Sequence, residues 1–162
     1  MRRGLTRNRV STFNPMEDIM SKTNLELVQD VYAAFGRGDM QALMDALHPD
    51  VTWGMIGRPQ DVPMAGIRNG KAGVGEFFKI LHEVQQLRDF APQKFVATDD
   101  TVCVIGHTKW TMNNNGVAGE NDWVHVLTLK DGKIIKYRGH QDTGLLAEAY
   151  HAKPATKRAA NG

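Results

Sequence analysis

The sequence contains a single cysteine, Cys103, among its 162 residues. One cysteine excludes an intrachain disulfide and a metal site built from several cysteines. Because Cys103 is flanked by Val102 and Val104, we expect it to be a small buried apolar residue. A chain that has no disulfide framework is expected to be cytoplasmic.

The chain also lacks any apolar run long enough to cross a bilayer, and its opening lacks the apolar segment of a secretory signal. We therefore expect no membrane partner. Hydrophobic residues make up 41% and charged residues 23%, which is typical of a folded globular protein. The length provides one compact domain with its own core and is too short for two.

Basic residues are scarce between the two ends of the chain. Seven of the 20 lie in residues 1–10 and 151–162, which leaves 13 basic and 18 acidic residues between them, a net charge near −5. A nucleic-acid-binding surface would need a basic stripe on the folded part, so no nucleic-acid partner is expected.

The distribution of charge suggests three parts. We expect a flexible basic tail over residues 1–23, a folded domain over 24–150 and a second flexible basic tail over 151–162. An alternative for the first tail is that it precedes a true start at Met16 or Met20.

Helical spacing of apolar residues predicts three helices in the first half of the domain. The first begins at Asn24 as its cap, the second follows Asp39 as its cap and is stopped by Pro49, and the third lies within residues 66–87. The apolar faces that support them are Leu25, Val28, Val31, Tyr32 and Phe35; Met40, Leu43, Met44 and Leu47; and Val74, Phe77, Phe78, Leu81 and Val84.

The second half of the domain is predicted to consist mainly of strands. One strand precedes the third helix at residues 50–57, and four follow it within residues 93–142. Asp131-Gly132 is a two-residue hairpin signal, and Asp142 or Thr143 caps a short final helix. The order predicts an α+β fold, in which a curved antiparallel sheet wraps around the helices as a half-open cone with an internal cavity.

Alternation along the last strands predicts which side chains share a face. A turn at Asp131-Gly132 pairs Lys130 with Lys133, which places Asp122 opposite Gln141. A turn centred near Asn115 places Thr108 opposite Asp122. Two rows of side chains result, one on each face of the sheet. A shift of the strand pairing by an odd number of residues would exchange the two faces. The first holds Thr108, Trp110, Asp122, Val124, Val126, Tyr137 and Gln141; the second holds Cys103, Ile105, His107, Trp123, His125, Leu127, Leu129 and His140.

Three stretches carry a family resemblance: VYAAFGRGDMQALMDALHPDVTW, DWVHVLTLKDGKI and RGHQDTGLL. They resemble the SnoaL-like and ketosteroid-isomerase-like branch of the nuclear transport factor 2-like superfamily, over about residues 24–150. The resemblance implies the cystatin-like cone, with mixed pairing at the sheet edge. This superfamily includes isomerases, cyclases, epoxide hydrolases, dehydratases and non-enzymes, so the fold does not select the activity.

The resemblance places the first row in the cavity, because an acid at the place of Asp122 points inward in ketosteroid isomerases and donates to an oxyanion. Burial would raise the pKa of such a carboxyl group and keep it neutral. Asp122 is then the catalytic residue, as oxyanion donor or, if ionised, as general base. In the alternative, Asp122 only caps a strand end. Predicted ligand-binding residues are Tyr32, Trp53, Met55, Thr108, Trp110, Tyr137 and Gln141.

Two departures from that family limit the chemistry. The isomerase base falls at Met55, which cannot take a proton, and the inward tyrosine of the first helix falls at Val31, one position before Tyr32. The arginine and two acids of the epoxide hydrolases fall at Gly106, Thr108 and Gly139. A mechanism with one acid, as in SnoaL-like cyclases, stays open.

Two functions follow. The first is a SnoaL-like enzyme of isomerase or cyclase type that transfers a proton on an apolar carbonyl compound, using Asp122 as its single cavity acid. The alternative is a non-catalytic dimeric protein that binds a small apolar ligand. We expect no cofactor and no metal, although the row of His107, Trp123 and His140 holds two possible metal ligands. A homodimer is expected through the outer face of the sheet, where the second row lies.

Overall fold

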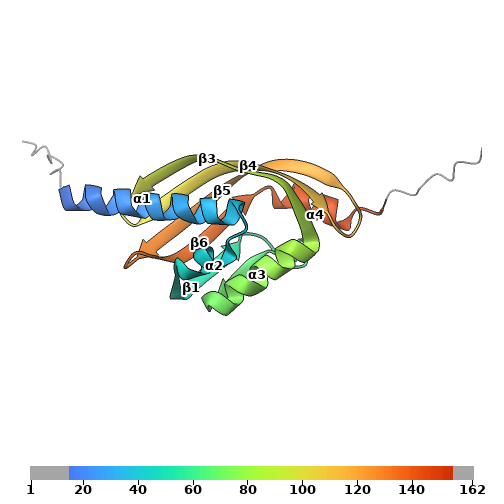
Figure 1. Ribbon diagram of the computed structural model, residues 1–162. Helices are drawn as coiled ribbons and strands as arrows, with labels where there is room; N and C mark the ends of the chain where they lie inside the picture. Colours follow the sequence, from blue (N-terminus) through green and yellow to red (C-terminus); the bar gives the residue numbers. More distant parts are fainter. Residues whose placement is uncertain (1–14, 155–162) are drawn as a thin grey trace, which may run out of the picture.

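The computed structural model describes residues 15–154, with side chains described from Thr23 onward. This part of the chain contains four helices and six strands. The strands form one curved sheet, and helices pack against its concave face (Figure 1). Their bounds are α1 Pro15–Gly36, α2 Met40–Asp45, β1 Leu47–Met55, β2 Gly66–Asn69, α3 Gly70–Val84, β3 Gln85–Thr98, β4 Thr101–Met112, β5 Ala118–Lys130, β6 Lys133–Gln141 and α4 Thr143–His151. The predicted α+β class and the curved sheet are confirmed.

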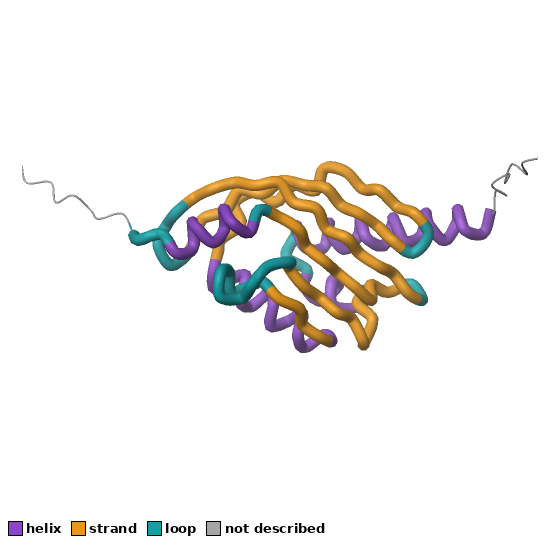
Figure 2. The backbone as a smooth tube through the Cα atoms, turned by 180° about the vertical axis from the view of Figure 1, so that it is seen from behind, coloured by secondary structure: helices purple, strands orange, loops and turns teal. Residues whose placement is uncertain are grey.

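The strands lie in the order β2-β1-β6-β5-β4-β3. The pair β1 and β6 is parallel, and every other neighbouring pair is antiparallel. Seen from behind, the strands form the near surface and the long helices lie beyond them (Figure 2). The sheet therefore has a convex outer face and a concave inner face that meets α1 and α3.

Alternation of side chains produces this layering. Along β4, buried and more exposed residues alternate without a break from Thr101 to Met112. The inward residues of the central strands and the apolar stripes of α1 and α3 form one buried cluster, which includes Val28, Leu47, Val74, Val104, Leu127 and Ile134. Among the described residues, no helix is long and apolar enough to cross a membrane.

Two predicted helix caps and the predicted hairpin turn are confirmed. The Asp39 side chain accepts from Ala42 N at 3.0 Å, and the Asp142 side chain accepts from Leu145 N at 2.9 Å, so both residues cap helices. Asp131 and Gly132 have positive φ angles of 52° and 71°, as their two-residue turn requires.

Other boundaries were predicted wrongly. The first helix begins at Pro15, so residues 15–23 are helical and Asn24 does not cap it; Asn24 Nδ2 donates instead to Asp99 O at 3.1 Å. The second helix ends at Asp45, and Pro49 lies in β1. The sequence interpretation also missed β2. The rest of the first predicted tail, residues 1–14, and residues 155–162 lie outside the described part.

The register of β5 differs from the prediction by one residue on both sides. Leu129 pairs with Ile134 but Thr128 pairs with Lys136, so Ile135 is an extra residue in a β-bulge. On the other side, Thr108 pairs with Asn121 rather than Asp122. A slip of one residue exchanges the faces of a strand. β5 therefore turns Asn121, Trp123, His125, Leu127 and Leu129 inward and Asp122, Val124 and Val126 outward.

Candidate functional site

A cavity lies between the concave face of the sheet and the helices α1 and α3. Its volume is about 90 Å³, compared with the ~10–15 Å³ that one water molecule needs. The cavity can therefore hold a small organic molecule. Its wall is largely aromatic and aliphatic, with Tyr32, Trp53, Phe77, Phe90, Trp123 and Tyr137 among the residues that line it.

Flat rings line the wall in two stacks. Trp53 stacks on Tyr137 with ring centroids 3.8 Å apart. Trp123 stacks on His125 at 4.0 Å and on Phe90 at 4.9 Å. Stacked rings form rigid flat surfaces, which suit a flat ligand.

Tyr32 and His125 form a hydrogen bond inside the cavity. Tyr32 Oη lies 2.6 Å from His125 Nδ1, and the two residues come from α1 and β5. A phenol is more acidic than a neutral imidazole N–H, so we infer that Tyr32 donates and that the neutral ring carries its proton on Nε2. Among the described residues His125 Nε2 has no hydrogen-bond partner.

The cavity carries no fixed charge among its described lining residues, because no Asp, Glu, Lys or Arg contributes to it. Burial, with a smaller contribution from nearby His140, lowers the pKa of His125 to about 3. Burial is also the main reason why the pKa values of Tyr32 and Tyr137 are raised above the ordinary tyrosine value. All three groups are therefore neutral at physiological pH.

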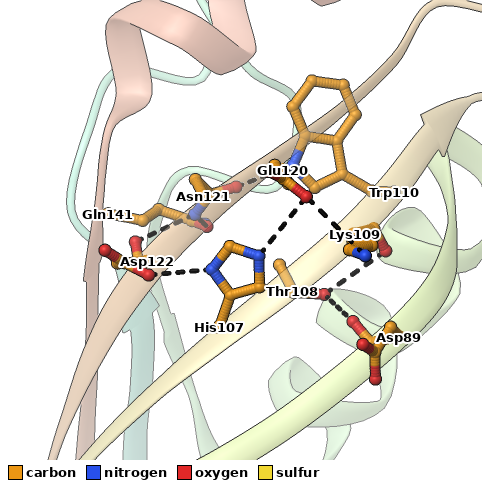
Figure 3. A network of polar contacts seen from close by, with 9 residues as sticks. All are labelled: Asp89, His107, Thr108, Lys109, Trp110, Glu120, Asn121, Asp122 and Gln141. Atoms are coloured by element: carbon orange, nitrogen blue, oxygen red, sulfur yellow. Dashed lines mark hydrogen bonds and ion pairs between the residues drawn. The ribbon is translucent and has the colours of Figure 1, made fainter.

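Asp122 does not lie in the cavity, and the prediction that it does is wrong. Its side chain is 88% exposed on the convex face, where Oδ1 lies 2.8 Å from His107 Nδ1 (Figure 3). Glu120 and Lys109 complete this surface network. The one-residue slip of β5 is the cause, and it removes Asp122 from any role as a cavity acid.

The predicted ligand-binding residues divide into two groups. Trp110 is 1% exposed but does not line the cavity; its Nε1 donates to Asn121 Oδ1 at 2.7 Å behind the wall. The structure brings the other six together around the cavity: Tyr32, Trp53, Met55, Thr108, Tyr137 and Gln141. Whether they bind a ligand stays a prediction.

His125 and Trp123 line the cavity, although the sequence interpretation placed them on the outer face. A signal for them exists in the neighbouring strands. Gly106 of β4 pairs with Trp123, and Gly139 of β6 pairs with His125. A Cβ at Gly106 would overlap the Trp123 indole. Glycines on flanking strands thus mark the inward positions where β5 carries its large rings.

The proposed outer row of His107, Trp123 and His140 does not exist, because Trp123 is turned inward. Within residues 23–154, no group of three or more His, Cys, Asp or Glu side chains is placed to hold a metal ion. His107 instead faces acidic groups, and hydrogen bonding to Asp122 is the main reason why the pKa of His107 is raised.

Solved structures with the same fold are numerous. An NTF2-like protein from Burkholderia xenovorans is 29% identical, with a TM-score of 0.72, over 80% of this chain and 97% of that one. TerC, crystallised with polyporic acid, is also 29% identical, with a TM-score of 0.72, over 80% of this chain and 99% of its own.

A Mesorhizobium loti protein described as a SnoaL-like polyketide cyclase is 19% identical, with a TM-score of 0.60, over 70% of this chain and 95% of that one; it shows the fold alone. No curated protein is significantly similar to this chain in sequence. The model of the SnoaL-like domain matches residues 28–137, more than half of the chain, and the protein therefore belongs to the SnoaL-like domain family.

Proposed function

We propose that this protein binds a small, flat, uncharged carbonyl compound in its cavity and polarises the carbonyl oxygen, as an enzyme of isomerase or cyclase type. The observation that carries the proposal is the Tyr32–His125 hydrogen bond inside a cavity whose described lining has no charged side chain. TerC, which is 29% identical, was crystallised with the small molecule polyporic acid, and this supports a small-molecule ligand here.

His125 is the central residue of the proposed site. With Nδ1 occupied by Tyr32, the Nε2–H group donates to the ligand oxygen. A neutral imidazole is a suitable donor for polarising a carbonyl group when its pKa is low. The hydroxyl of Tyr137 has no partner among the described residues and provides a second donor on the same wall. When solvent takes the α-proton of the bound ketone, the developing enolate would therefore be stabilised by neutral donors instead of a carboxyl group.

A second candidate function is binding without turnover. It is favoured by the pKa of His125, about 3, and by the raised pKa of Tyr32. General acid–base catalysis is most efficient when the pKa lies near the operating pH, and these groups are far from it.

A matched set of naphthalene compounds tests the proposed site. We expect 2-acetylnaphthalene to quench the fluorescence of the cavity tryptophans and to bind more tightly than 2-naphthoate, because the described lining of the cavity offers no cation for a carboxylate. His125→Phe should weaken binding of the ketone about fivefold through loss of one hydrogen bond, and should remove the shift of its carbonyl stretching frequency to lower values.

His140→Phe is the control, because it removes a histidine from the outer face of the neighbouring strand and should leave the affinity unchanged. Equal affinity for the ketone and the carboxylate, or an unchanged carbonyl frequency in His125→Phe, would contradict the proposed site.

Exchange of the methyl protons of 2-acetylnaphthalene in D₂O separates the two functions. Faster exchange with wild type than with His125→Phe supports the enzyme, and the buffer rate in both supports binding alone.

We also propose a homodimer formed through the convex face of the sheet. Ile105 and Val124 pair across β4 and β5, and they remain 38% and 37% exposed. Of the residues predicted for this face, Trp123, Leu127 and Leu129 are buried inward instead. Sedimentation equilibrium should give a dimer for wild type and a monomer for Ile105→Lys; a monomeric wild type would contradict the proposal. The cytoplasmic location stays a prediction.

A further inference from the structure

A line of polar side chains extends from behind the cavity wall to the cavity itself. Trp110 Nε1 contacts Asn121 Oδ1 at 2.7 Å, and Asn121 Nδ2 contacts Gln141 Oε1 at 3.1 Å (Figure 3). The Gln141 amide nitrogen contacts the sulfur of Met55. Trp110 and Asn121 are buried, whereas Gln141 and Met55 line the cavity.

The first member of this line fixes the direction of every hydrogen bond after it. An indole N–H can only donate, so Asn121 must present its oxygen to Trp110. The Asn121 amide nitrogen is then left to donate to Gln141 Oε1 and to the Asp122 carbonyl. Gln141 therefore has its oxygen occupied, and its Nε2 group, with two hydrogens, is turned toward Met55 and the cavity.

We propose that Gln141 is a specificity-determining residue that donates a hydrogen bond to the ligand, and that Trp110 and Asn121 are positioning residues that keep it a donor. This inference rests on the proposed function. A thioether is a weak acceptor, so the contact with Met55 leaves the Nε2 group available to a better one. The ligand consequently has an acceptor that faces Gln141 in addition to the carbonyl that faces His125.

The sheet register sets the spacing of these two donors. Gln141 pairs with Trp123, and His125 lies two residues further along β5 on the same inward face. The Cα atoms of diagonal neighbours of this kind are ~7–8 Å apart across two antiparallel strands, and their side chains stand on the same face. That spacing fits two acceptor oxygens at opposite ends of one aromatic ring. The substrate class is therefore a ring compound with two carbonyl-type acceptors.

The test compares two ring ketones that differ at one end. 1,4-Diacetylbenzene has an acceptor at both ends, and 4-ethylacetophenone has an apolar ethyl group in place of the second acceptor. We expect wild type to prefer the diacetyl compound. Gln141→Met should reduce the ratio of the two affinities about fivefold, because one hydrogen bond is lost. Asn121→Leu should reduce the ratio as well, since Gln141 can then rotate its amide group.

Gln86→Met is the matched control, because Gln86 is an exposed residue of β3 outside the cavity lining. The ratio of the two ketone affinities in this variant should equal that of wild type. A second measurement needs no variant. In the wild-type protein, nuclear Overhauser effects should connect the Gln141 amide protons with the Met55 methyl protons, and their absence would overturn the inference.

An unchanged ratio in Gln141→Met, with both compounds still bound, would overturn this inference and leave the proposed function standing. Failure of both compounds to bind wild type would overturn the two together. A reduced ratio in Gln141→Met with an unchanged ratio in Asn121→Leu would overturn the positioning role.

Discussion

The two faces of the sheet each place a histidine beside an oxygen atom, and they do so under opposite conditions. On the concave face, His125 contacts the Tyr32 hydroxyl inside a cavity whose described lining has no charged residue, and its pKa is lowered to about 3. On the convex face, His107 contacts the exposed carboxylate of Asp122, and its pKa is raised. The same side chain is thus neutral on one face and part of a solvated charge network on the other.

This difference shows that the surroundings of a histidine decide its chemistry. Burial disfavours the imidazolium form, whereas a neighbouring carboxylate favours it. On the convex face, water competes for every contact, so ion pairs there contribute little to stability. On the concave face the wall side chains are largely buried, and the lower local dielectric strengthens each hydrogen bond between them.

The largest expected effect comes from a substitution at Gly106, because the absence of a side chain there leaves room for the Trp123 indole. A Cβ at Gly106 would overlap the Trp123 indole and lie 2.7 Å from the Ala91 carbonyl oxygen. We expect Gly106→Val to lower the free energy of unfolding by about 3 kcal/mol, as measured by urea denaturation. Gly75→Ala is the control: a Cβ at Gly75 meets nothing within 4 Å, so stability should rise by up to about 1 kcal/mol. Wild-type stability in Gly106→Val would show that Trp123 can move freely.

A smaller effect should appear when pH is lowered. The folded protein keeps His125 neutral down to a pKa of about 3, whereas in the unfolded chain the histidine pKa is about 6.5. The unfolded state therefore binds more protons below pH 6.5, and stability falls as pH falls. Between pH 7 and pH 5 the loss from this group is about 2 kcal/mol.

His125→Gln removes this titration, so the difference in stability between wild type and the variant should shrink by that amount over the same pH range. His107 is present in both proteins and cancels from the comparison. Parallel pH profiles for wild type and His125→Gln would mean that His125 is not held neutral in the cavity.

The smallest expected effect is that of Asp122→Asn on the cavity. Because Asp122 lies on the convex face, the affinity for 2-acetylnaphthalene should equal that of wild type. The change should instead lower the raised pKa of His107 toward its ordinary value, as followed by its ring proton resonances during titration. A loss of ketone binding in this variant would return Asp122 to the cavity and overturn the assignment of the faces.

The failure at Asp122 has a specific physical origin. Side chains alternate with a period of two, so an error of one residue in register moves a whole strand's side chains to the other face. The Asp131-Gly132 turn was identified correctly, but the bulge at Ile135 lies only a few residues beyond it. Hydrophobicity did not resolve the choice, because both rows of the predicted sheet carry apolar residues. The glycines opposite Trp123 and His125 were the signal that could have resolved it.

Local patterns in the sequence were enough to predict most of the helices and strands and the class of the fold, since helical spacing, caps and the hairpin turn are local properties of the chain. Six of the residues that line the cavity were also predicted. Thr108, Tyr137 and Gln141 follow from the alternation along β4 and β6, and the other three, Tyr32, Trp53 and Met55, lie on α1 and β1. The sequence did not predict which side chains meet, namely Tyr32 with His125, and Trp110 with Gln141 through Asn121. Those contacts join segments far apart in sequence and depend on register, which the sum of all cross-strand pairings sets and no single stretch of sequence specifies.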